Sequence, residues 1–137
     1  MISFAIPKKS VSHTAAFHGH CFDYVTEGEP CGQLVRCLSG EIELLGHAGE
    51  WIIPSDHMVY IPSDRMFRVR ARRAASVQIT RFCSREVSWK HDGCWVGEVG
   101  EFAQRMLTYA QKWGEDVDAS DHQAQCFFVT LGEVVSQ

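Results

Sequence analysis

Short segments in which apolar and polar residues alternate follow one another between residues 1 and 90, and turn-forming residues separate them. Residues 41–44 have the period of two that is typical of a strand with one wet face. Glycine or proline interrupts the pattern at positions 40, 54 and 62. The predicted strands are residues 33–38, 41–44, 51–53, 58–61, 67–71 and 76–82. Many short strands of this kind predict a mostly β fold, a sandwich or a barrel.

The hydrophobic period changes to that of a helix in the last third of the chain. From residue 98, apolar residues recur at helical spacing until Gly114 ends the run. Asp121 is predicted to cap a second helix. The apolar stripe of this second helix consists of Phe127, Phe128, Leu131, Val134 and Val135.

This stripe has to be covered by another apolar surface. Either the chain's own strands or a second copy of the chain can provide one. We predict the second arrangement, a homodimer with these five residues at its interface.

The length of 137 residues and the hydrophobic fraction of 45% are those of one globular domain. We expect a β-barrel at residues 1–95 and a two-helix extension of the same domain at residues 96–137. No apolar run reaches the ~18 residues of a membrane span. The first residues, MISFAIPKKS, are unlike a secretory signal because the lysines follow the apolar part. We therefore expect a cytoplasmic protein with no membrane partner.

The net charge of −4 argues against direct binding of nucleic acid by this chain. The middle of the chain is nevertheless basic, and Arg68, Arg70 and Arg72 alternate with small or apolar residues. This spacing places the three arginines on one face of a strand. We interpret that face as solvated, and a patch for an anion or a partner is the alternative.

Six cysteines stand at positions 21, 31, 37, 83, 94 and 126, without a Cys-x-x-Cys pair. A chain of this size and apolar content does not need disulfides to fold. A structural zinc site is poorly supported because such sites usually bring two cysteines within a few residues. We predict free, reduced thiols.

Several short motifs follow one another in a fixed order between residues 33 and 69. They are Ser39-Gly40-Glu41, Gly49-Glu50-Trp51, Pro54 and Ile61-Pro62. In order and spacing the chain resembles the cupin-type effector-binding domain of AraC-family transcriptional regulators. The resemblance implies a cupin barrel followed by two helices that commonly form the dimer interface. It also places Trp51 in the core. A DNA-binding helix-turn-helix domain normally follows in that family, and no such pair of helices is present within this chain.

The metal site of the cupin family can be compared with this chain position by position. Glu27 and Glu29 stand where the family has two histidines, Gln33 stands at the glutamate position and Phe67 at the last histidine position. Phenylalanine cannot ligate a metal, and glutamine is a poor ligand. We therefore predict a barrel without metal or other cofactor, and not an enzyme. The fallback metal site is the true His-x-His pair, His18 and His20.

The mouth and interior of such a barrel form a natural site for a small molecule. The register implied by the resemblance directs most of the expected lining residues toward the interior, with Met58 or Tyr60 adding to the wall. Two carboxylates there would suit a cationic or hydroxyl-rich ligand, although both glutamates could equally lie on a solvated turn. The predicted pocket consists of Glu27, Glu29, Gln33, Val35, Cys37, Met58, Tyr60 and Phe67.

Three functions remain open at this point. We favour an effector-binding and dimerisation domain of an AraC-type regulator, with a small-molecule effector as partner. The alternatives are a stand-alone cupin that binds a small molecule and, third, a metal-dependent cupin enzyme.

Overall fold

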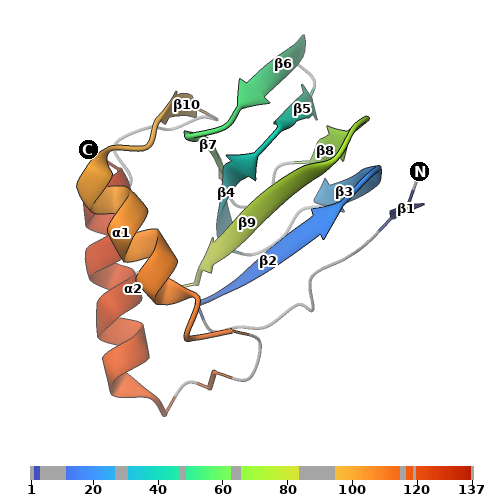
Figure 1. Ribbon diagram of the computed structural model, residues 1–137. Helices are drawn as coiled ribbons and strands as arrows, with labels where there is room; N and C mark the ends of the chain where they lie inside the picture. Colours follow the sequence, from blue (N-terminus) through green and yellow to red (C-terminus); the bar gives the residue numbers. More distant parts are fainter. Residues whose placement is uncertain are drawn as a thin grey trace.

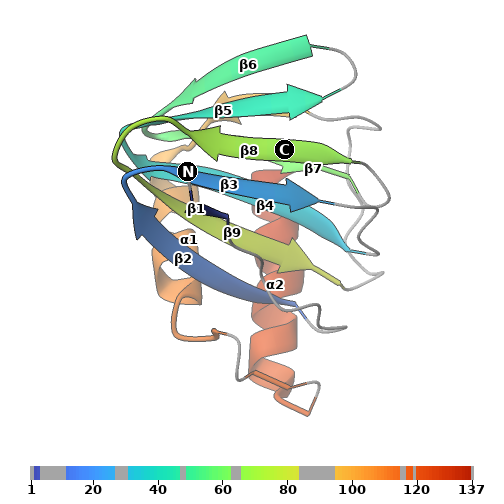
Figure 2. The same ribbon diagram turned by 90° about the vertical axis from the view of Figure 1, so that its right-hand side faces the viewer.

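The computed structural model describes residues 2–3, 12–26, 31–46, 49–62, 66–83, 95–114, 117–118 and 120–136. The strands form two sheets that face each other, and both helices lie against one of them (Figures 1 and 2). The strands are β1 (Ile2–Ser3), β2 (His13–Gly19), β3 (Phe22–Thr26), β4 (Gly32–Ser39), β5 (Glu41–Gly46), β6 (Gly49–Pro54), β7 (His57–Ile61), β8 (Phe67–Ala71), β9 (Ala75–Phe82) and β10 (Trp95–Glu98).

One sheet has the strand order β10-β7-β4-β9-β2, and we call it the helix-side sheet. The other has the order β1-β3-β8-β5-β6, and we call it the distal sheet. All neighbouring strands are antiparallel except β1 and β3. This arrangement confirms the mostly β cupin fold with two C-terminal helices, and each of the six predicted strands is present.

Tight turns join successive strands and set their register. Gly40, between β4 and β5, has a φ of 77°, and a Cβ added there would lie 2.6 Å from the carbonyl oxygen of Ala74. The backbone conformation and the close approach both require glycine at this position. The predicted Ser39-Gly40 turn is therefore a structural feature of the barrel.

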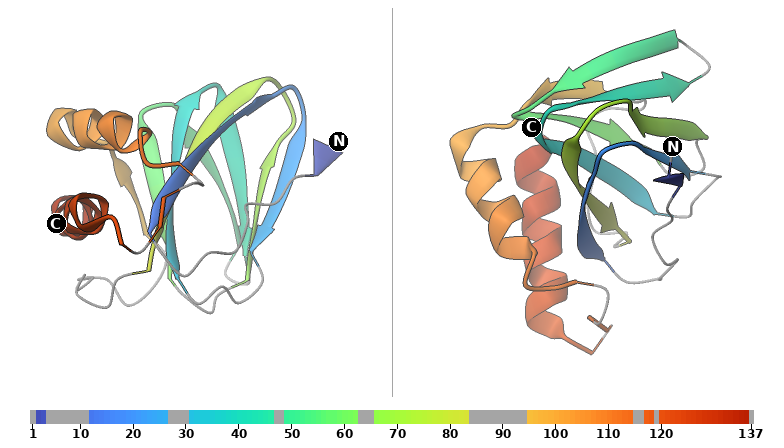
Figure 3. Two further views of the ribbon diagram at one scale, coloured as in Figure 1. Left: turned by 90° about the horizontal axis from the view of Figure 1, so that it is seen from below. Right: turned by 45° about the vertical axis from the view of Figure 1, so that its right-hand side comes forward.

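The helices α1 (Glu101–Ala110) and α2 (His122–Val135) cover the helix-side sheet (Figure 3). Asp121 caps α2 as predicted, since its Oδ1 accepts a hydrogen bond from the backbone N–H of Ala124 at 3.0 Å. Before α1, the chain is extended through Glu98, where strand β10 pairs with β7. The apolar pattern that begins at residue 98 therefore spans the end of a strand as well as a helix.

Two apolar clusters stabilise the fold. The first lies between the sheets and contains Val35, Cys37, Leu44, Val69 and Ile79 among others. The second lies between the helix-side sheet and the helices. It contains Leu34, Met58, Tyr60, Phe82, Leu107, Phe128, Leu131 and Val135. The sheet that separates the two clusters is thus buried on both faces.

The second cluster corrects the predicted dimer interface. Phe128, Leu131 and Val135 are buried against the chain's own sheet, and Phe127 and Val134 pack beside them. An amphipathic stripe requires an apolar partner surface but does not indicate which surface that is. Here the outer face of the helix-side sheet provides it for Phe128, Leu131 and Val135, so these three are not available to a second copy, while an interface at the partly exposed Phe127 and Val134 stays a prediction.

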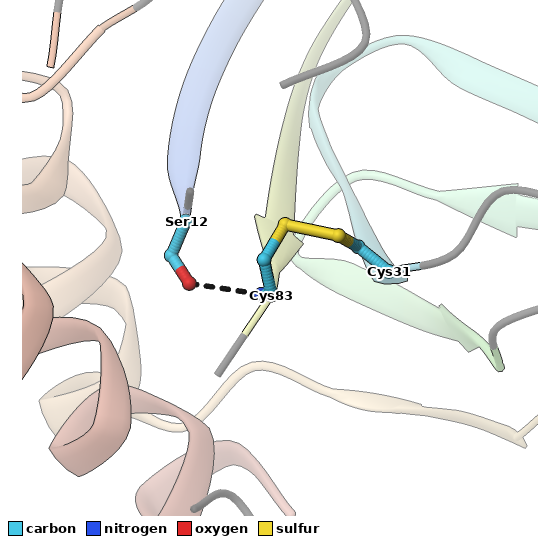
Figure 4. The surroundings of a disulfide bond; sticks show 3 residues. All are labelled: Ser12, Cys31 and Cys83. Atoms are coloured by element: carbon cyan, nitrogen blue, oxygen red, sulfur yellow. Dashed lines mark hydrogen bonds between the residues drawn. A yellow bond between two sulfur atoms is a disulfide. The ribbon is translucent and has the colours of Figure 1, made fainter. Parts of the chain in front are cut away.

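The thiol prediction is also wrong in part, because Cys31 and Cys83 form a disulfide (Figure 4). The bond joins the residue before β4 to the residue after β9, where Gly32 and Phe82 are partners in the ladder. Beside it, the backbone N–H of Cys83 donates to Ser12 Oγ at 2.9 Å. Among the described residues, Cys21, Cys37 and Cys126 are free thiols.

Candidate functional site

Strand β4 directs alternate side chains into the space between the sheets. Gln33, Val35 and Cys37 point into this space, and Val35 and Cys37 are part of its apolar cluster. Three of the predicted pocket residues therefore share one face, as expected. Burial raises the pKa of the Cys37 thiol to about 11, so this thiol is neutral at physiological pH.

Three polar residues lie at one end of this apolar interior. The hydroxyl of Tyr24, on β3, donates to Gln33 Oε1 at 2.7 Å and so connects the two sheets. Arg81, on β9, lies opposite Gln33 in the ladder, and its side chain is fully buried. These three polar residues mark the end of the barrel where β4 begins and β9 ends.

Tyr24 and Arg81 are absent from the predicted pocket. Arg81 could have been identified from the sequence, because it is a charged residue inside the predicted apolar strand at residues 76–82. A buried charge in a strand usually has a specific electrostatic role. Tyr24 had no such signal, because β2 and β3 lie in a part of the chain for which no strand was predicted.

A pocket of about 350 Å³ lies at the same end of the distal sheet. Val25, Arg68 and Leu45 are neighbours in the strand register. Their side chains lie on the outer face of the distal sheet, because the alternate residues Tyr24, Leu44 and Val69 belong to the interior cluster. Phe67 also lines it, packing against the interior cluster and close to Gly46, but no other residue of the predicted interior pocket does. The exposed side chain of Met66 completes the wall. The pocket is therefore mainly apolar, with one guanidinium at its edge.

Met58 and Tyr60 do not belong to the interior. Both lie on the opposite face of β7, in the cluster beneath the helices. The tyrosine ring packs against Gly32, and burial raises the pKa of its hydroxyl to about 12. The expectation failed because β7 is buried on both faces, so its apolar run carries no alternation that identifies the inner face.

Trp51 also departs from its expected place in the core. It lies on β6, the edge strand of the distal sheet, and 38% of its surface is exposed. Glu27 and Glu29 lie outside the described residues, so the cationic or hydroxyl-rich ligand deduced from them remains a prediction.

The two described residues at the cupin metal positions, Gln33 and Phe67, do not fit a metal ion. The amide of Gln33 is engaged by Tyr24, and Phe67 has no donor atom. His18, of the fallback pair, lies on β2, where its Nδ1 is 2.5 Å from Ser76 Oγ, and both His18 and His20 are exposed. Within the described part of the chain, no three His, Cys, Asp or Glu side chains gather in a way that could hold a metal.

Of the alternating arginines, Arg68 and Arg70 lie on the outer face of β8, Arg72 lies in the bend that follows it, and all three are paired with carboxylates. Arg68 Nε donates to both carboxylate oxygens of Asp23 at 2.8 and 2.7 Å. Arg70 Nη2 lies 2.6 Å from Glu43 Oε2, and Arg72 Nε lies 2.9 Å from Glu43 Oε1. Three guanidinium groups thus share two carboxylates, those of Asp23 and Glu43, so each arginine has an ionic partner within this chain.

No protein-family model matches the chain, and no curated protein matches it. Several solved structures do match the chain. An unsaturated fatty acid-bound ToxT from Vibrio cholerae strain SCE256 matches at a TM-score of 0.60 and 10% identity, over 91% of this chain. ToxT from Vibrio cholerae O395 bound to (E)-4-(8-methylnaphthalen-1-yl)but-3-enoic acid matches at a TM-score of 0.61 and 10% identity, over 88% of this chain.

The matched part of ToxT is the N-terminal effector-binding domain of an AraC-family protein. The chain has the fold of that domain. It spans 54% of the ToxT chain in both comparisons. Within the described part of this chain, no helix is both long enough and apolar enough to cross a membrane.

Proposed function

We propose that the chain is the small-molecule effector-binding domain of an AraC-type transcriptional regulator. The observation that carries this proposal is the shared architecture, a two-sheet barrel followed by two helices that match the ToxT domain over about nine-tenths of the chain. Fold alone does not define function, so the proposal also needs a site. The pocket at the Phe67 end of the barrel is the site that we assign to the effector.

The walls of this pocket favour a ligand with an apolar body. Val25, Leu45, Met66 and Phe67 present hydrocarbon and aromatic surface, and Arg68 is the only charged side chain among its described lining residues. A volume of about 350 Å³ lies in the range of small-molecule sites. The fatty acid in the similar ToxT structure is a ligand of this amphiphilic class.

Calorimetric titration with a long-chain unsaturated fatty acid, with a neutral sugar as reference, tests this proposal. Met66→Asp places a carboxylate in the apolar wall at an exposed position and is expected to weaken fatty acid binding about tenfold or more. Ile52→Asp is the matched control, because Ile52 is equally exposed on the distal sheet but does not line the pocket. Equal loss in both variants, or no saturable binding of any probe, would contradict the proposal.

The proposed regulator forms a homodimer through the outward face of α1. Phe102 and Tyr109 are 65% and 54% exposed, and Met106 lies between them on the helix. Two large exposed aromatic rings on one helix are typical of a surface that another protein covers. This face is distinct from the part of the α2 stripe that the chain itself buries.

Sedimentation of Phe102→Asp tests the dimer. The variant is expected to fold and to sediment as a monomer at a concentration where the unmodified chain is a dimer. A monomeric unmodified chain, or a dimer that the substitution does not weaken, would contradict this interface.

A further inference from the structure

A second cavity lies on the other side of the helix-side sheet, between β4 and α1. It has a volume of about 360 Å³ and is lined by Arg36, Gln104, Arg105, Thr108 and Tyr109. Arg36 belongs to β4 but points away from the barrel interior, on the face opposite Val35 and Cys37. The cavity is therefore separate from the pocket at the Phe67 end of the barrel.

The guanidinium of Arg36 is buried, and its hydrogen-bond partners among the described residues are all neutral. Only 8% of the residue is exposed. Its Nη1 donates to Gln78 Oε1 at 3.3 Å and to Thr108 Oγ1 at 3.4 Å. The other amide atom of Gln78 is already engaged, since Nε2 donates to Thr14 Oγ1 and to the carbonyl oxygen of Leu107. These contacts hold Arg36 in place without balancing its charge.

No carboxylate of the described residues lies within 4.0 Å of Arg36. Burial lowers the pKa of the guanidinium, and the exposed Asp56 offsets that effect only in part. A buried cation without an ionic partner is costly, and buried charges in proteins are normally paired. An anion that enters the cavity would neutralise the positive charge of the Arg36 guanidinium.

Other donors surround the same cavity. Within the part of the chain that the structure describes, Arg105 is held by an exposed ion pair with Glu101 at 3.0 Å, and such pairs are weak enough to exchange for another anion. The hydroxyl oxygen of Tyr109 accepts from Lys112 Nζ at 3.2 Å, which leaves its proton available to a ligand. Two guanidinium groups and a phenol hydroxyl suit the oxygen atoms of a carboxylate or a phosphate.

From this geometry we infer a binding site for an oxyanion, the carboxylate or phosphate group of a small molecule, in which Arg36 is the main cation and Arg105 the second. An anion there touches both β4 and α1. The other face of β4 lines the barrel interior, so an anion in this site and the barrel interior contact the same strand from opposite sides.

Nuclear magnetic resonance titration of isotope-labelled protein with inorganic phosphate, and separately with acetate, tests the inference. Sodium chloride at the same ionic strength is the reference. We expect saturable shifts at the side chain of Arg36 and at the amides of α1 in the millimolar range. Saturation by acetate alone identifies a carboxylate ligand, saturation by phosphate alone a phosphate ligand, and either result supports the site.

Three variants decide whether Arg36 is responsible. Arg36→Met is expected to weaken binding about tenfold or more, because it removes the charge-assisted hydrogen bonds. Arg105→Gln has a smaller effect in the same direction. Arg72→Gln removes the same charge from an exposed position in the bend after β8 and leaves the affinity unchanged.

Should Arg36→Met fail to fold, Arg36→Lys takes its place. It keeps the charge but loses the planar fork, and weaker binding is again expected. The inference is overturned if neither anion saturates, or if the Arg36 variant binds as tightly as Arg72→Gln.

Discussion

Removal of the Cys31–Cys83 disulfide is expected to cost a large part of the stability of the fold. The bond closes a loop with a sequence separation of 52 residues. In the chain-entropy account, freeing a loop of this length stabilises the unfolded state by about 4 kcal/mol. A domain of this size has roughly 5–15 kcal/mol of stability in total. The double variant Cys31→Ala/Cys83→Ala should therefore unfold at a clearly lower denaturant concentration.

Urea unfolding of the oxidised protein, the reduced protein and the double variant measures this loss. Cys126→Ala is the matched control because Cys126 is an exposed free thiol on α2, and its removal should change the free energy of unfolding by less than about 0.5 kcal/mol. The reasoning is refuted if the double variant is as stable as the control. It is also refuted if alkylation without a reductant modifies Cys31 and Cys83.

Three further predictions concern packing, backbone and ionisation. Phe128→Ala should lower the free energy of unfolding by about 3–5 kcal/mol in urea titration, because the ring is fully buried beneath the sheet. Gly40→Ala should lower it by about 1–3 kcal/mol in the same assay, because its φ of 77° disfavours a side chain. The pKa of the Tyr60 hydroxyl is about 12 in the folded state and 10 in the unfolded state, so the folded state keeps this proton to a higher pH. Stability is unaffected by Tyr60 below pH 10 and falls by roughly 2–3 kcal/mol toward pH 12, and Tyr60→Phe should remove this part of the fall.

The strands of the barrel could be predicted because their turns carry strong signals. Gly40, Pro54 and Pro62 lie at the ends of strands, and Asp121 lies at the start of α2. The three strands before residue 27 (β1, β2 and β3) were missed, and so was β10. In β2, small and histidine residues interrupt the apolar alternation, so hydrophobic patterning does not reveal it.

The faces of the elements were harder to predict than their existence. Met58 and Tyr60 lie on a strand whose two faces are both buried, and no periodicity distinguishes inside from outside there. The stripe on α2 indicates burial but not the identity of the partner surface. These ambiguities explain why Met58 and Tyr60 were predicted on the wrong face, and why three of the five residues predicted at the dimer interface are buried by the chain itself.

The disulfide depends on the pairing of strands that are distant in sequence. Cys31 and Cys83 approach each other only because β4 and β9 are neighbours in the helix-side sheet. The same pairing brings Arg81 opposite Gln33. Neither relation is visible in the spacing of the residues, since strand order follows from the topology of the whole barrel.

Nuclear magnetic resonance mapping of a bound unsaturated fatty acid is the measurement that tests the central claim most directly. The account predicts saturable shifts that concentrate around Val25, Leu45, Met66 and Phe67, the residues that line this pocket. Shifts confined to the exposed aromatic residues of α1, or no saturable shifts with any small molecule tested, would contradict an effector site at this end of the barrel.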